Sequence, residues 1–214
     1  MFNQFISDLV KELKNELPGF AAQKLMAPLG RKSPTDYLTK NVIPRKSAVL
    51  LLIYPDSELL FPKTILIVRP ENEGGNHAGQ IAFPGGGFDS LDSDLSQTAL
   101  REAEEEIGIN RKSVFLIGEL TPLYIPISNY MVYPYVGFSK TKPKFKIHIQ
   151  EVQDLLECNL KELFLKQNKG TVQRSIKTLN KEIEVPCYKI NERIIWGATA
   201  MILSEFEQII KRLD

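Results

Sequence analysis

The helix predicted over residues 96–107 carries three carboxylates on one face, and this feature constrains the fold more than any other in the chain. At about 100° per residue, Glu102, Glu105 and Glu106 stand at i, i+3 and i+4 and therefore share a face. Glu104 points away from that face. Each like-charged pair so placed destabilises a helix by roughly 0.2–0.5 kcal/mol. The fold must therefore bring a compensating positive charge to this helix.

Two sources of that charge are available. Arg101 can reach Glu105 at i+4, but one guanidinium cannot neutralise three carboxylates. A divalent cation can, because hard carboxylate oxygens suit Mg²⁺ or Mn²⁺, and substrate phosphates often complete the shell of Mg²⁺. The alternative is a solvated acidic helix face, which is common. A Gly-Gly-Gly turn at 85–87, one short acidic loop upstream, favours the metal.

Residues 101–109, Arg-Glu-Ala-Glu-Glu-Glu-Ile-Gly-Ile, resemble the second half of the signature of the Nudix hydrolases. Every specified position of that half is matched. Gly108 stands where the helix has to stop in a left-handed turn. The chain is thus similar to a family of enzymes that hydrolyse diphosphates.

The first half of the signature matches with an irregularity. Counting strictly back from the helix gives Gly87 and Ser93, and a serine does not replace the expected loop glutamate. A loop that is one residue longer gives Gly86 and Asp92, which restores an acidic residue. That insertion resembles the coenzyme A pyrophosphatase branch of the family.

Other segments, from about Ser47 onward, are similar to the same branch. They are residues 77–86, 123–131, 151–152 and 195–203. The stretch from 67 to 76 departs from the branch, since it keeps Arg69 and lacks the usual Ser, Thr and Leu-Arg pair. This departure bears on recognition of the coenzyme A moiety more than on hydrolysis itself.

The resemblance implies an α/β fold, namely a Nudix-type α/β/α sandwich with a mixed β-sheet and, here, an added N-terminal helix. It implies a metal-dependent pyrophosphohydrolase that uses Mg²⁺ or Mn²⁺. By carry-over from the family signature, the metal-ligand candidates are Glu102, Glu105, Glu106 and Gly86.

Two further groups of the signature have expected roles. Arg101 should orient Glu105 and also Asp92 through its fork of donors, which makes it a member of the catalytic set. Gly85 and Gly86 should let the backbone approach the metal and the substrate closely, because a Cβ would obstruct them. A tight turn alone would also explain these glycines.

The general base has two candidates. Glu102 comes first and Glu151 second, although Glu151 could equally be a solvated residue at a strand end. His77 titrates near neutral pH, but the resemblance does not make it the base. We expect His77 to brace a turn or to contact the substrate.

Two more residues are expected to bind the substrate. Arg69 stands at a strand end and could contact a phosphate, or it could pair with Glu71 or Glu73. Gln80 belongs to the segment leading into the glycine turn.

Several aromatic residues have a plainer reading. Trp196 opens an apolar helical pattern and is expected to lie in the core. An adenine could stack on one member of the aromatic run, but strand packing is the default for all of them: Tyr124, Tyr130, Tyr133 and Tyr135.

Composition limits the class of protein. The chain has 214 residues, is 43% hydrophobic and has a net charge of +1, so it can bury the core of one domain. No basic stripe is interleaved with aromatics, so a nucleic acid polymer is not an expected partner. No run approaches the roughly 18 apolar residues that span a membrane. The expected partner is a small nucleoside diphosphate derivative.

The cysteines bear on the cellular compartment. Cys158 and Cys187 are too few for a disulfide framework or a zinc site, and are expected to be buried thiols in a reducing compartment. No signal peptide is recognised, because acids and lysines interrupt the N-terminal apolar residues. A cytoplasmic location is the expectation.

The chain divides into an N-terminal part, residues 1–46, and a Nudix hydrolase domain, residues 47–214. Residues 2–17 have the spacing of an amphipathic helix that packs on the domain or on a second subunit, in which case the protein is a homodimer. Residues 18–46, with four prolines, are predicted as a connecting arm. A helical turn is expected near 160–165 and a closing helix over 196–213. The predicted strands are 48–54, 64–69, 80–83, 114–121, 131–138, 151–157, 171–178 and 182–189.

These observations favour hydrolysis of coenzyme A or its thioesters, giving 3',5'-ADP and a phosphopantetheine product. A second hypothesis is a pyrophosphatase of another nucleoside diphosphate derivative, such as ADP-ribose or a dinucleotide. A third, from another class, is a ligand-sensing module without turnover, which normally loses the carboxylates that Glu102, Glu105 and Glu106 retain here.

Overall fold

Strand β1 (Arg45–Pro55) is the centre of the main sheet. The computed structural model describes residues 1–38, 42–56, 61–71, 79–176 and 181–213. From Arg45 to Ile53, β1 pairs in parallel with β7 (Tyr130–Ser139), and the other described pairings of the sheet are antiparallel. Residues 50–54 are fully buried, which is why this strand is an unbroken apolar run without alternation.

The remaining strands extend the sheet on both sides of this pair, in the order β3-β2-β1-β7-β5, with β4, β6 and β8 branching from it. Their bounds are β2 (Pro62–Val68), β3 (Ile81–Ala82), β4 (Gly85–Gly87), β5 (Val114–Glu119), β6 (Leu123–Ile125) and β8 (Asp154–Asn159). A second, antiparallel sheet consists of β9 (Lys169–Ile176), β10 (Lys181–Ile190) and β11 (Arg193–Trp196).

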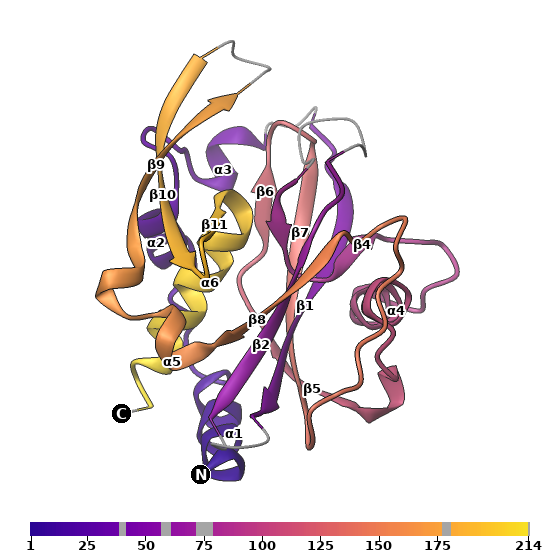
Figure 1. The fold of residues 1–214 in the computed structure, drawn as a ribbon. Helices are drawn as coiled ribbons and strands as arrows, with labels where there is room; N and C mark the ends of the chain where they lie inside the picture. The colour runs from indigo at the N-terminus through magenta and orange to yellow at the C-terminus, as the bar shows by residue number, and fades with distance from the viewer. Residues whose placement is uncertain (39–41, 57–60, 72–78, 177–180, 214) are drawn as a thin grey trace.

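Helices cover both faces of the main sheet (Figure 1). Alternate residues of β1 enter two different cores, since neighbouring side chains of a strand point to opposite faces. Leu50 and Leu52 pack with α4 (Leu95–Ile107), whereas Leu51 and Ile53 pack with α6 (Gly197–Ile210) and α1 (Phe2–Glu12). The predicted α/β/α sandwich with a mixed sheet is confirmed.

Strand β1 changes its antiparallel neighbour halfway along. Near its start Ala48 pairs with Gly86 of β4, and near its end Ile53 pairs with Thr64 of β2. Between them the N–H of Leu50 donates to the carbonyl of Pro84 at 2.8 Å. This change of partner places the glycine turn against the central strand.

The N-terminal helix is shorter than predicted. It ends at Glu12 instead of residue 17, because Lys14 and Asn15 bond three residues back instead of four and the chain tightens into turns. Leu9 is fully buried in the same cluster as Phe206 of α6. The prediction that this helix packs on the domain is confirmed.

The prediction of a connecting arm over residues 18–46 is wrong. In the described residues of this segment, 18–38 and 42–46, there are three short helices, α2 (Gly19–Gln23), η1 (Lys24–Met26) and α3 (Pro34–Tyr37), and β1 begins at Arg45. Helices of three to five residues are too short to show a periodic pattern. The segment is held instead by contacts with residues far along the chain.

The buried carboxylate of Glu205 on α6 supplies several of these contacts. It accepts hydrogen bonds from Gly19 N at 3.1 Å, from the side-chain amide of Gln23 at 2.9 Å and from the hydroxyl of Thr121 at 2.5 Å. Glu205 has no exposed surface. One acidic side chain therefore joins the N-terminal segment, the loop after β5 and α6.

Smaller differences concern the ends of elements and the shortest strands. The predicted strands missed β4, β6 and β11, which have three or four residues and too little length for an alternating pattern. Strand β8 starts three residues later than predicted, and α6 covers 197–210 instead of 196–213. The predicted helical turn is α5 (Leu160–Leu163), and single 3₁₀ turns occur at η2 (Arg111–Ser113) and η3 (Lys166–Asn168).

Two compositional expectations can be compared with the fold. Cys158 and Cys187 are both free and fully buried, as predicted. Over the described ranges, no helix has the length and apolar character required to span a bilayer.

Replacing Glu205 by Gln should lower the free energy of unfolding by about 1–3 kcal/mol, because the amide puts an N–H₂ group against donors and removes the charge that strengthens their hydrogen bonds. Denaturant titration of the two proteins measures this. The matched control is Glu104→Gln on the exposed face of α4, where a change within about 0.5 kcal/mol is expected. Equal effects of the two substitutions would contradict the role of Glu205.

Candidate active site

Helix α4 is fixed at both ends, and this orients its acidic face. At the start, the side chain of Asp94 accepts hydrogen bonds from the backbone N–H groups of Ser96 and Gln97. At the end, Gly108 adopts the left-handed conformation with φ 67°. A Cβ on Gly108 would lie 2.6 Å from the carbonyl oxygen of Lys146, so only glycine fits.

The carboxylate of Glu106 is buried against the glycine turn. Its side chain accepts a hydrogen bond from the N–H of Gly85 at 2.8 Å, and only 4% of the residue is exposed. Burial raises the pKa of Glu106 to about 8, although Gly85 and Arg69 act in the opposite direction. The charged form of Glu106 is therefore poorly compensated by the protein alone.

Glu102, one turn earlier, faces the neighbouring glycine. A Cβ built on Gly86 would overlap the carboxylate of Glu102, and one built on Gly85 would overlap the carbonyl oxygen of Ala48. Burial raises the pKa of Glu102 as well, against the opposing effect of Arg101. Gly86 thus allows a close approach of backbone and carboxylate, and Gly85 allows a close approach of the turn to β1, which a side chain at either position would prevent.

Arg101 connects the acidic loop to the helix face. Its guanidinium binds both carboxylate oxygens of Asp92, at 2.9 and 3.0 Å, and also donates to Glu102 and Glu105 at 2.9 Å each. This bidentate contact lowers the pKa of Asp92 to about 2. The structure therefore places Asp92, and not Ser93, against the arginine.

The three carboxylates among the predicted metal ligands lie on one helix face but differ in their surroundings. The side chain of Glu105 is 54% exposed and turns to Arg101, whereas Glu102 and Glu106 are directed at the glycines. Within the described ranges, no three Asp, Glu, His or Cys side chains already form a set that could hold a metal ion.

The chemistry of Glu102 and Glu106 nevertheless fits a divalent cation. Glu106 is buried, Glu102 is partly buried, and the pKa of each carboxylate is raised; hard oxygen ligands of this kind suit Mg²⁺ or Mn²⁺. The backbone of Gly86 lies directly beside Glu102, where a side chain would block access.

Glu151 lies in the turn that precedes β8, not in the strand as predicted. Its loop is tied to the end of α4, since His148 N donates to the carbonyl of Glu106 at 2.9 Å. The side chain of Glu151 is about half exposed and lies 3.4 Å from the imidazole of His148. Its negative charge raises the pKa values of Glu102 and Glu106, so it acts within the field of the same site.

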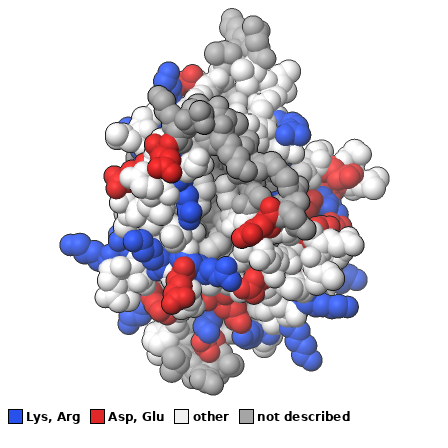
Figure 2. Space-filling model, turned by 45° about the horizontal axis from the view of Figure 1, so that its top comes forward, with Lys and Arg blue, Asp and Glu red and all other residues white. Residues whose placement is uncertain are grey.

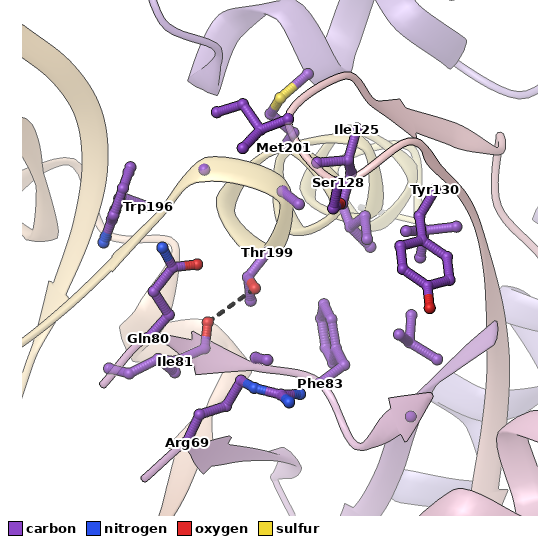
Figure 3. A pocket seen from close by; sticks show the side chains of 18 of the residues that line it. Arg69, Gln80, Ile81, Phe83, Ile125, Ser128, Tyr130, Trp196, Thr199 and Met201 are labelled. Atoms are coloured by element: carbon purple, nitrogen blue, oxygen red, sulfur yellow. Dashed lines mark hydrogen bonds between the residues drawn. The ribbon is translucent and has the colours of Figure 1, made fainter. Parts of the chain in front are cut away.

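A cavity of about 730 Å³ opens on the other side of the glycine turn, with Gly85, Gly86 and Gly87 in its wall. Arg69 and Gln80, both predicted to bind substrate, line it together (Figure 3), and the N–H of Arg69 donates to the carbonyl of Gln80 at 3.0 Å. His77, the third such residue, lies outside the described residues.

The N-terminal turn of α6 closes part of the cavity wall. The hydroxyl of Thr199 donates to the carbonyl of Ile81 at 2.8 Å, which joins α6 to β3 (Figure 3). The prediction that Trp196 lies in the core is wrong. Trp196 is the last residue of β11, is only half-buried and lines the cavity. The apolar pattern that follows it belongs to the helix, whereas the tryptophan precedes that helix.

The tyrosines divide between the two faces of the sheet. Tyr130 lines the cavity, and the guanidinium of Arg45 lies 4.2 Å from its ring centroid. Tyr133 and Tyr135, at odd positions of β7, pack with the core under α4, and Tyr124 is buried on β6. Strand packing therefore describes three of the four.

Sequence reasoning missed the distant residues of the cavity wall. Arg31, Arg174 and Arg193 all line it, from the loop before α3, from β9 and from β11. None stands in a motif, so no local signal could have found them.

On the face shown in Figure 2, basic and acidic side chains are interspersed and form no field of a single sign.

Fold and site together define the class of this protein. A family model described as NUDIX domain matches residues 44–179, so the chain belongs to the Nudix hydrolases and is a pyrophosphohydrolase. Enzymes of this family generally use divalent metal ions.

Two relatives show how far the likeness extends. The uncharacterized Nudix hydrolase NudL of Yersinia pestis (strain Pestoides F) is 31% identical over 209 residues, which is 96% of this chain and 94% of the relative. Its namesake from Pectobacterium atrosepticum is 34% identical over 142 residues, or 66% of this chain and 72% of the relative. The likeness to the Yersinia protein thus includes the N-terminal segment.

Solved structures resemble the fold at lower identity. The Nudix hydrolase RenU from M. smegmatis has a TM-score of 0.52 at 14% identity, covering 80% of this chain and 88% of that chain. A MutT/nudix family protein from Enterococcus faecalis also scores 0.52, at 16% identity, covering 84% and 70%. At these identities the likeness concerns the fold alone.

The buried carboxylate of Glu106 predicts an unusual pH dependence of stability in metal-free protein. The unfolded chain loses this proton near pH 4.5, whereas the folded chain keeps it up to about pH 8. Between these values the folded state binds more protons, so its stability falls as the pH rises. Glu106→Gln removes this term, and its melting temperature in EDTA should therefore rise relative to the wild type from pH 5 to pH 8.5. A difference that stays constant over this range would contradict the burial argument.

Proposed function

We propose that this protein hydrolyses the diphosphate bond of coenzyme A or its thioesters with Mg²⁺ or Mn²⁺, giving 3',5'-ADP and phosphopantetheine or acyl-phosphopantetheine. The observation that carries the proposal is the double role of the turn Gly85–Gly87. Its backbone lies against Glu102 and Glu106, and it also forms part of the wall of a cavity of about 730 Å³. A diphosphate bound at this part of the cavity wall would therefore lie across the backbone of the turn from the carboxylates.

The metal-binding residues in this proposal are Glu102 and Glu106, with Glu105 as a third carboxylate and the backbone of Gly86. A bound divalent cation neutralises phosphate oxygens and makes a coordinated water more acidic. Arg101 holds Glu102 and Glu105 in place while its own position is fixed by Asp92. We assign Arg101 the role of a positioning residue.

Proton transfer and substrate binding fall to other side chains. Glu102 is the first candidate for the general base, because burial raises its pKa and makes it a better proton acceptor. Glu151 is the second, since it lies in a turn held against the end of α4. Arg69 and Gln80 line the cavity beside the glycine turn, where Arg69 can neutralise a phosphate.

Two observations support a substrate of the coenzyme A kind. The cavity falls in the range of about 300–1,000 Å³ that small-molecule sites occupy. Three arginines from separate parts of the fold, Arg31, Arg69 and Arg174, line it, which suits a ligand with several anionic groups.

Both cysteines are buried and free, in keeping with a reducing cytoplasmic location.

Incubating the purified protein with Mg²⁺ and coenzyme A, beside ADP-ribose and a dinucleotide, tests this assignment. We expect 3',5'-ADP from coenzyme A, faster than any product from the others, and no turnover by Glu106→Gln. Cleavage of ADP-ribose without cleavage of coenzyme A would overturn the substrate and leave the chemistry intact. Tight nucleotide binding without hydrolysis of any compound would indicate a sensor instead.

The glycine turn offers a matched pair of variants. Gly86→Ala puts a Cβ into the carboxylate of Glu102 and should lower kcat by roughly a hundredfold, because small displacements of catalytic groups have effects of this order. Gly87→Ala brings its Cβ no closer than 3.9 Å to the hydroxyl of Tyr130 and should lose far less. Thermal unfolding of both variants checks that the fold persists. Similar kcat values for the two would contradict the role of Gly86.

A further inference from the structure

The cavity extends from the glycine turn to the second sheet. A Cβ on Gly87 would lie 3.9 Å from the hydroxyl of Tyr130, so the glycine turn and Tyr130 are neighbours. Figure 3 shows Tyr130 and Trp196 on opposite sides of the pocket. The wall around Trp196 is therefore remote from the carboxylates of α4.

Arg174 stands at this remote wall with part of its hydrogen-bonding capacity unused. Its guanidinium carbon lies 5.4 Å from the ring centroid of Trp196, in the geometry of a cation–π contact. The Nε–H of Arg174 is buried and has no acceptor among the described residues. A buried donor without a partner destabilises the ligand-free protein, and an anionic oxygen would remove that penalty.

The other charged residues of the same wall also favour an anionic ligand at Arg174. Arg193 also lines the cavity, but it is paired with Asp154 at 2.9 Å. Over the described ranges, no ion pair joins Arg174 to a carboxylate, although Glu192 lines the same wall. The planar fork of an arginine matches a phosphate group, and its stacking on an indole ring holds the fork in one orientation.

We propose that Arg174, held against Trp196, binds a phosphomonoester group of the substrate that is remote from the diphosphate being cleaved. The inference rests on the proposed function in one respect, namely that the diphosphate lies at the glycine turn. On this proposal, the preferred substrates are nucleoside diphosphate derivatives that carry an additional phosphate. Compounds that lack this phosphate are poorer substrates.

Pairs of compounds that differ only in this phosphate test the proposal. The kcat/KM ratios to measure are coenzyme A over dephospho-coenzyme A and NADPH over NADH. For the wild type we expect at least one ratio of roughly ten to a hundred, the range of a charge-assisted hydrogen bond. In Arg174→Met that ratio should fall to near 1. A wild-type ratio near 1 for both pairs, or a ratio that Arg174→Met leaves unchanged, would overturn the proposal.

A binding experiment separates this inference from the proposed function. Calorimetric titration of the full chain in EDTA with 3',5'-ADP and with AMP needs no turnover. The wild type should bind 3',5'-ADP about tenfold or more tightly than AMP, and Arg174→Met should lose this difference. If coenzyme A is not hydrolysed but this difference depends on Arg174, the proposed function fails and the inference stands. If coenzyme A is hydrolysed and the difference does not depend on Arg174, the proposed function stands and the inference about Arg174 fails.

Two further variants guard against indirect effects. Arg111→Met removes a positive charge on the far side of α4, where Arg111 pairs with Glu104 at 3.3 Å, and should leave the ratios at the wild-type values. Should Arg174→Met fail to fold, Arg174→Lys keeps a charge but loses the planar fork, and it should lower the ratios several-fold. Equal losses in Arg111→Met and the Arg174 variants would count against a specific contact.

Discussion

Two carboxylates of α4, the buried Glu106 and the partly buried Glu102, lie against the backbone of the glycine turn, and this packing organises the site and the sheet around it. Glu106 is joined to Gly85 by a hydrogen bond of 2.8 Å, and Gly85 in turn pairs with Val49 of the central strand. This connection anchors the acidic face of α4 to the middle of the sheet. It also removes negative charge from water without supplying enough positive charge, because burial raises the pKa of both Glu102 and Glu106. A divalent cation would resolve the conflict that the fold itself creates.

The surrounding contacts hold the carboxylates of α4 in these positions. Arg101 distributes its donors over Asp92, Glu102 and Glu105, so that the acidic loop and the helix face form one unit. Gly108 stops the helix where the loop between β7 and β8 crosses it, and the hydrogen bond from His148 N to the carbonyl of Glu106 holds that loop against the helix end. A site of this kind lowers the free energy of unfolding, because buried charge without a partner destabilises the folded state. The same charge favours the binding of a ligand of opposite charge.

The cavity next to the site has a different origin. Its walls come from the start of β1, the glycine turn, the loop before α3, the second sheet and the first turn of α6. The carboxylate of Glu205 helps to assemble these parts, because it binds donors from the N-terminal segment and from the loop after β5. In the function that we propose, hydrolysis and the choice of substrate thus depend on separate regions of the fold. The carboxylates belong to one helix, whereas the cationic wall depends on how the N-terminal and C-terminal segments meet.

The amino-acid sequence predicts the helix over 96–107, the sharing of one face by Glu102, Glu105 and Glu106, the left-handed end at Gly108 and the apolar central strand. These are local properties that periodicity and spacing reveal. Tertiary structure alone decided that Glu105 turns to Arg101 while Glu106 is buried, that residues 19–26 pack on α6, and that Arg174 meets Trp196. The physical reason is that these features join residues far apart in the chain, or elements too short to carry a period, and only the folded chain brings them together.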